Sequence, residues 1–97
     1  MEGHSVISPD VLARYAADAA REVDGVRSVV ESTLHRRGVK LTGDEFEVHV
    51  EIEWGAVVPE VAAAVQGRVT DYLVRMADVR PSAVHVVVDE VARPASR

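Results

Sequence analysis

The residues best suited to chemistry alternate along one segment. Acidic residues and a histidine occupy every second position there, namely Glu47, His49, Glu51 and Glu53. Because alternate residues of a β-strand point to the same face, these side chains are expected to lie in a row. Carboxylates spaced in this way could act as general acid and base, as in glycosidases. No substrate-binding aromatic residues accompany them, so we favour ordinary solvation of an open strand face.

A second row of such residues lies near the C-terminus. His85 and Asp89 flank Val87 with the same spacing of two in a valine-rich segment. If the two strands are parallel neighbours, then His49, His85 and a carboxylate could meet. Zinc needs three or four oriented ligands, and no H-E-x-x-H or other local ligand motif is present. We therefore expect no cofactor, and keep a small metal- or ligand-binding module using His49 and His85 as the alternative hypothesis.

The strongest pattern in the sequence is the strand that carries the first row. Apolar residues alternate with the polar ones without exception, at Phe46, Val48, Val50, Ile52 and Trp54. This alternation predicts a strand over 46–54 with one buried and one solvated face. The sheet should therefore be covered by helices on one face only. Trp54 shares the parity of the buried residues, which predicts that it plugs the core at the strand end.

Two amphipathic helices are predicted to cover the buried face. Ser8-Pro9-Asp10 begins the first, and Asp24-Gly25 ends it. Pro59-Glu60 begins the second, whose apolar stripe is Val61, Val65, Val69, Tyr72, Leu73 and Met76. Gly67 lies inside this helix, where glycine costs about 1 kcal/mol relative to alanine. We expect a close approach to a neighbouring backbone there.

The remaining elements complete a two-layer α+β domain. We predict a weak strand over 26–32, a hairpin through Thr42-Gly43-Asp44-Glu45, a last strand over 83–90, and a possible short strand over 5–7. The predicted fold is a three- to four-stranded mixed or antiparallel sheet with two helices packed on one face. Residues 6–91 form one domain, with flexible termini at 1–5 and 92–97.

Charge and composition narrow the function classes. The chain has 97 residues, with 11 Lys and Arg against 16 Asp and Glu, so its net charge is −5 and a basic nucleic-acid surface is not expected. With 0 cysteines there is no thiolate chemistry and no disulfide. No apolar run is long enough to span a bilayer, so direct membrane insertion is not expected. The one basic cluster is His35-Arg36-Arg37 with Lys40, which is best interpreted as a solvated loop.

Two blocks of sequence resemble one known family. The first runs from Ile7 to Leu12 and continues from Ala19 to Val26. The second, E-I-E-W-G-A-V-V-P-E-V-A at 51–62, is similar to the strand, aromatic-Gly turn and "(I/V)PEVA" helix start of the alkaline shock protein family, also called the envelope stress response family. A closing V-x-V-x-V strand is matched by Val84, Val86 and Val88. The resemblance covers residues 6–91.

The resemblance implies a function without catalysis. Members of this family are small cytosolic bacterial proteins without known catalytic residues; some associate with one another and are held near the membrane by separate anchoring proteins. It therefore implies a cytoplasmic scaffold in the envelope stress response or in envelope homeostasis, not an enzyme. We expect self-association through a sheet edge or the uncovered sheet face, a membrane-anchored partner, or both. The candidate interaction surface is Glu47, His49, Glu51, Glu53, His85, Asp89, Arg36 and Arg37.

Overall fold

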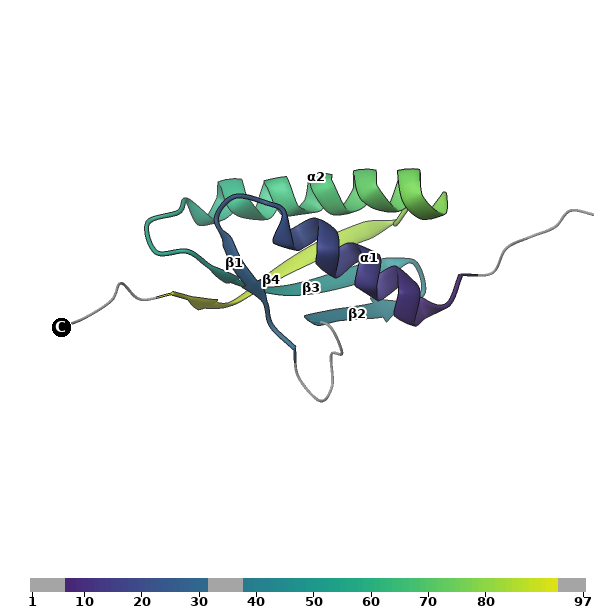
Figure 1. The fold of residues 1–97 in the computed structure, drawn as a ribbon, viewed down its shortest axis with the longest axis horizontal. Helices are drawn as coiled ribbons and strands as arrows, with labels where there is room; N and C mark the ends of the chain where they lie inside the picture. Colours follow the sequence, from purple (N-terminus) through teal and green to yellow (C-terminus); the bar gives the residue numbers. More distant parts are fainter. Residues whose placement is uncertain (1–6, 32–37, 93–97) are drawn as a thin grey trace, which may run out of the picture.

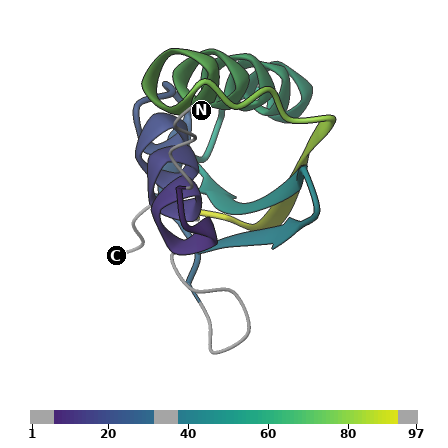
Figure 2. The same cartoon turned by 90° about the vertical axis from the view of Figure 1, so that its right-hand side faces the viewer.

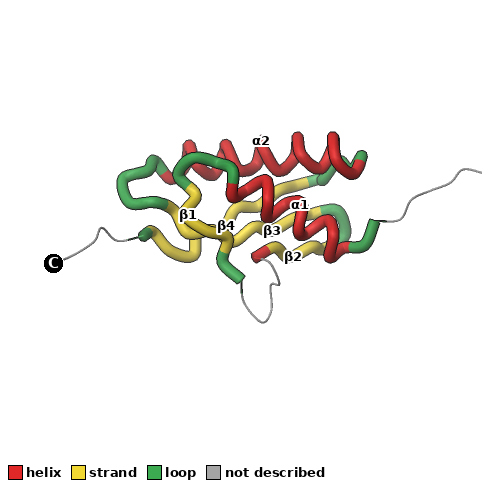
Figure 3. Tube along the Cα trace, viewed as in Figure 1, coloured by secondary structure: helices red, strands yellow, loops and turns green. Residues whose placement is uncertain are grey.

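The computed structural model describes residues 7–31 and 38–92 of the chain. Its elements are, in order, α1 (Pro9–Arg21), β1 (Val26–Val29), β2 (Val39–Thr42), β3 (Glu45–Ile52), α2 (Val58–Ala77) and β4 (Ala83–Val91). The ribbon in Figure 1 shows this arrangement, and the tube in Figure 3 separates helices from strands by colour. Turned by 90°, Figure 2 shows both helices on the same face of the sheet. The predicted α+β two-layer fold is confirmed.

Strand β3 is the centre of the sheet. It pairs in parallel with β4 along its whole length, from Glu45 opposite Ala83 to Ile52 opposite Val91. Its other edge is shared by two antiparallel strands, β1 beside the C-terminal half of β3 and β2 beside the N-terminal half. Since a strand has only two edges, β1 and β2 lie end to end as one interrupted edge strand. The sheet is therefore mixed, and the predicted hairpin between β2 and β3 is confirmed.

Each helix begins at a signal that the sequence contains. The Ser8 hydroxyl accepts a hydrogen bond from the Val11 N–H at 3.2 Å, and Pro9 occupies the first turn of α1. The face of α1 that packs inward is made of small residues, Ala13, Ala16, Ala17, Ala19 and Ala20. α2 buries Val61, Val65, Val69 and Leu73, whereas Met76 in its last turn is 51% exposed. Alanines let α1 lie close to its neighbours, which suits a core with few aromatic residues.

The alternation along β3 divides core from surface as predicted. Phe46, Val48, Val50 and Ile52 are at most 1% exposed, beneath the helices. Burying each such side chain stabilises the fold by about 1.5–3 kcal/mol. The residues between them, Glu47, His49 and Glu51, point to the face that the helices leave open and are only partly buried. This face therefore carries the charged residues that the sequence singled out.

The prediction that Trp54 plugs the core is wrong. β3 ends at Ile52, and the chain turns immediately, with the Ala56 N–H donating to the Glu53 carbonyl at 3.1 Å. Gly55 has a φ of 91°, which favours glycine and helps to close this turn. The turn breaks the strand alternation, so Trp54 no longer follows the parity of Ile52. Its side chain is 63% exposed.

The expected close approach at Gly67 is also wrong. A Cβ atom built on Gly67 would meet nothing within 4 Å. At the N-terminus, Ile7 is not part of a strand, and the rest of the predicted strand over 5–7, like the predicted flexible segment 1–5, lies outside the described residues. At the other end, Ala92 is buried and its N–H donates to the Ile52 carbonyl at 2.7 Å. The remainder of the predicted tail, 93–97, lies outside the described residues.

Candidate interaction surface

His49 lies between two carboxylates on the open face of the sheet. Its Nε2 is 2.6 Å from Glu47 Oε2, and its Nδ1 is 3.1 Å from Asp89 Oδ2. Glu47 is two residues away on β3, whereas Asp89 comes from β4, where the register shifts after Val88. The His49 side chain is only 12% exposed, although it lies on the open face. Both ring nitrogens are thus engaged by side chains of the protein itself.

The two carboxylates determine the protonation of His49. Burial lowers the pKa of His49, because a charged imidazole loses solvation, but the hydrogen bonds that the ring donates to Glu47 and Asp89, and the charges of these groups, raise it. The pKa is raised overall from its ordinary value of about 6.5. The protonated ring can donate one hydrogen bond to each carboxylate, whereas the neutral ring has one N–H to donate. The arrangement therefore favours a charged imidazole held between two acids.

His85 does not join this group. It lies opposite Glu47 in the β3–β4 register, but its Nε2 contacts Glu45 Oε1 at 3.4 Å, and both side chains are more than half exposed. The sequence left open whether these two strands are neighbours; in the structure β3 and β4 pair in parallel, and His49 meets a carboxylate of β4. The structure shows no contact between the two histidines. Among the described residues, no group of three or more His, Cys, Asp or Glu side chains could hold a metal ion.

Of the other predicted surface residues, one is bonded on the sheet, one lies beyond the end of β3, and two lie outside the described residues. Glu51 accepts a hydrogen bond from the Ser28 hydroxyl at 3.2 Å, and Arg27 Nε lies 3.9 Å from the other oxygen. Glu53 is exposed beyond the end of β3, so it is not part of the strand row. Arg36 and Arg37 lie outside the described residues. The open face thus carries ion pairs and hydrogen bonds spread over a sheet.

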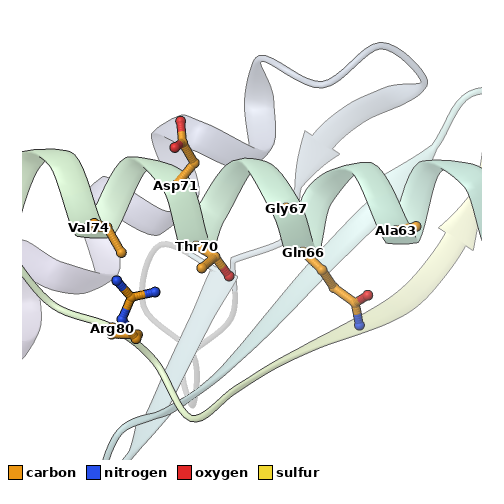
Figure 4. Close-up of a pocket in the computed structure, with 7 residues that line it drawn as sticks. All are labelled: Ala63, Gln66, Gly67, Thr70, Asp71, Val74 and Arg80. Carbon is orange, nitrogen blue, oxygen red and sulfur yellow. The ribbon is translucent and has the colours of Figure 1, made fainter.

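A groove beside β4 was not predicted. It runs along α2, with Arg80 from the α2–β4 connection near Val74, as Figure 4 shows. It is lined by Ala63, Gln66, Gly67, Thr70, Asp71, Val74 and Arg80. Gln66 spans to the strand, with its Nε2 donating to the Val84 carbonyl at 3.0 Å. The available sequence signal was the V-H-V-V-V run at 84–88, which places valine on both faces of the strand. A strand of that kind is typically covered on both sides, or lies against a partner.

Three apolar side chains are exposed near the end of the sheet where β3 and β4 finish. Trp54 is 63% exposed, Val57 53% and Val91 43%. Trp54 and Val57 belong to the β3–α2 connection, and Val91 lies opposite Ile52 on β4. Exposed tryptophan is uncommon on a surface that meets only water, and tryptophan is enriched among residues that dominate protein interfaces.

Fold and surface together define a class: a small two-layer α+β domain with an open, charge-paired sheet face. The chain belongs to the alkaline shock protein 23 family, whose model matches residues 1–93 and is described by a cell envelope-related function. The suspected family is confirmed. None of the curated proteins matches the chain. Among the described residues, no helix is long and apolar enough to cross a membrane.

Solved structures share the fold at low sequence identity. One variant of the MamM CTD has a TM-score of 0.62 and 17% identity, covering 93% of this chain and 100% of that one. A second, doubly substituted variant has a TM-score of 0.59, with 17% identity and the same coverage. A third variant has a TM-score of 0.53 and 16% identity, covering 86% of this chain and 98% of that one. At such identities the likeness concerns the fold alone.

Proposed function

We propose that the chain is a non-catalytic scaffold that works at the cell envelope by binding other proteins, its own copies among them. The cell envelope-related description of its family supports the setting. One observation carries the scaffold role: Trp54 is 63% exposed at the end of the sheet, and Val57 in the same connection is 53% exposed. A protein partner that covers this turn would remove a large aromatic side chain from water, which favours association.

The charges of the open face fit binding better than catalysis. A general acid or base must be within reach of a substrate, with its pKa tuned near the working pH. His49 already has both ring nitrogens on carboxylates, and Glu51 is bonded to Ser28. These pairs keep the sheet face polar, and they lie on an open surface where water competes with any bound substrate. From the family resemblance we further propose that the protein works in the cytoplasm and is held at the envelope by a separate membrane-anchored protein.

The test compares Trp54→Ala with a matched control in the native host. Met76→Ala removes an apolar side chain that is also about half exposed but lies in the last turn of α2. Cross-linking in cells, followed by recovery of the tagged chain, should yield the same membrane-anchored protein with the wild type and with Met76→Ala. The Trp54→Ala chain should recover several-fold less of this membrane-anchored protein. Equal recovery with all three chains would show that the turn at Trp54 is not the contact.

A second measurement uses the fluorescence of the same residue. Trp54 is the single tryptophan of the chain, so its emission reports only on this turn.

Light scattering on the purified protein should show growth in mass with concentration if copies associate. A monomer over a wide concentration range, with no envelope protein recovered by cross-linking, would refute the scaffold proposal.

A further inference from the structure

The outer edge of β4 has main-chain groups without a strand partner in the described part of the chain. Alternate residues of a strand direct their N–H and C=O groups to opposite edges. On β3, the His49 carbonyl accepts from Val30 N–H on the β1 side, and the Ile52 carbonyl accepts from Ala92 N–H on the β4 side. Even-numbered residues of β3 therefore bond β4. In a parallel pair, the residue opposite such a position directs its own groups away.

This rule identifies the free positions of β4. Val84, Val86 and Val88 lie opposite Phe46, Val48 and Val50, so their main-chain groups point away from β3. The hydrogen bond from Gln66 Nε2 to the Val84 carbonyl agrees with this, because Gln66 belongs to α2 and not to β3. After Val88 the register shifts, and a bulge ends the regular run. The free edge is thus the segment 86–88, with Val87 at its centre.

Among the described residues, no second strand pairs with this segment. Figures 1 and 2 show β4 beginning beside the C-terminal end of α2 and diverging from the helix along its length. Natural edge strands are usually blunted by lysine, proline or a short length. β4 has nine residues, Ala83–Val91, and contains neither lysine nor proline. In the described part of the chain, the bulge and the charged residues on either side of the valines are the features that protect this edge.

We propose that β4 pairs antiparallel with β4 of a second copy, about a two-fold axis at Val87. This assignment rests on the self-association in the proposed function, and it names the contact. With Val87 opposite Val87 of the second copy, Val86 lies opposite Val88 of that copy. Both of these positions have outward main-chain groups, so they form hydrogen-bonded pairs. Val87 becomes a non-hydrogen-bonded pair, in which the two side chains approach most closely.

Charge complementarity supports a second copy as the occupant. The same register brings His85 opposite Asp89 of the second copy, a carboxylate that also contacts His49 of its own chain at 3.1 Å. The two-fold axis repeats this pair on the other side of Val87. The His85 side chain is 57% exposed and makes a long contact of 3.4 Å with Glu45, so it can turn to the added strand. A basic group opposite an acidic one across an antiparallel pair is favourable, whereas like charges would repel. The sequence of β4 is therefore complementary to itself when reversed.

Disulfide trapping tests this pairing directly, because the chain contains 0 cysteines. Val87→Cys should form a covalent dimer under mild oxidation. Thr42→Cys is the control, since Thr42 is an exposed strand residue on the opposite edge of the same sheet. Paired cysteines reach a far higher effective concentration than freely diffusing ones, so we expect dimer formation at least about tenfold faster for Val87→Cys.

Two further variants test the register and the main-chain bonds. An equal mixture of His85→Cys and Asp89→Cys chains should cross-link faster than either chain alone. Val86→Pro removes an N–H that points away from β3, so adding it to Val87→Cys should abolish the fast cross-linking. Val86→Ala in the same background keeps the N–H and should retain the fast cross-linking. Circular dichroism and melting temperature verify that each variant is folded. If the proline variant does not fold, the mixed-cysteine experiment still tests the pairing.

Light scattering and cross-linking together distinguish the β4 pairing from self-association in general. If wild-type protein grows in mass with concentration while Val87→Cys cross-links no faster than Thr42→Cys, the β4 pairing is refuted and self-association stands. If the wild type is monomeric at all concentrations and the two rates are equal, the pairing and the self-association both fail. Fast cross-linking of Val87→Cys without enhancement in the mixed chains would overturn the register at Val87.

Discussion

Gly67→Ala should stabilise the protein, because this glycine occupies an exposed position in the middle of α2. A Cβ atom at Gly67 meets nothing within 4 Å, and the residue has ordinary helical backbone angles. Alanine is favoured over glycine in a helix interior by about 0.8–1.0 kcal/mol, because glycine loses more backbone freedom on folding. No contact in the described structure offsets this gain. The free energy of unfolding should therefore rise by about 1 kcal/mol.

The size of the effect is measurable by thermal and urea unfolding. For a domain of 60–100 residues, 1 kcal/mol corresponds to a rise of roughly 4–8 °C in melting temperature. The matched control is Ala64→Gly, because Ala64 is an exposed residue of the same helix, three positions away. It should lose about as much stability as Gly67→Ala gains, and the double variant should return to the wild-type value.

The prediction fails in a recognisable way. If Gly67→Ala lowers stability while Ala64→Gly behaves as expected, then the Gly67 face of α2 is covered in solution by something that tolerates no side chain. Measuring at several protein concentrations shows whether that cover is a second copy, since a self-association effect grows with concentration. If both variants leave the free energy of unfolding unchanged, the helix propensities of alanine and glycine at these positions do not affect stability, and the prediction is refuted.

Three further predictions follow from particular contacts. His49→Gln should cost more stability near pH 6 than near pH 9, measured as the shift in urea midpoint, because the raised pKa of His49 stabilises the fold below about 6.5 and this contribution disappears as the pH rises through the raised value; an equal cost at both pH values would contradict it. Gly25→Ala should destabilise the fold by about 1 kcal/mol or more, since Gly25 has a φ of 97° and a Cβ would lie 2.6 Å from Val61 Cγ2; an unchanged melting temperature would count against this. Added zinc should not raise the melting temperature, because both ring nitrogens of His49 are engaged and His85 is not shown to join them; a rise would revive the metal-binding alternative.

Local patterns in the sequence were enough to predict most elements of the fold. The strict alternation around Val48 and Val50 determines which face of β3 is buried, because a strand repeats every two residues. Ser8 and Pro59 mark helix starts through interactions within a few residues. The same reasoning failed at Trp54, where parity was extended past the last paired residue. A turn cancels alternation, and parity alone does not show where the strand ends.

At the candidate site, too, the sequence determined the faces of the strands but not the contacts between them. The sequence placed Glu47, His49 and Asp89 on one face, since each follows the period of its own strand. It did not determine that His49 contacts Asp89, because the bulge after Val88 shifts the later β4 residues relative to β3. Nor did it determine that the exposed His85 contacts Glu45 rather than Glu47, which lies opposite it. A shift of one residue changes which side chains meet, and nothing within either strand records it.

By itself, then, the sequence determined the class of fold, the buried face, the opposite charges gathered on the open face and the family, since these depend on short-range periodicity and local motifs. Only the tertiary structure decided that β1 and β2 share one edge of β3, that Trp54 lies in water, and that β4 has an uncovered edge. Those features depend on which strands become neighbours, and strand neighbours are chosen by the packing of the whole domain rather than by any single segment.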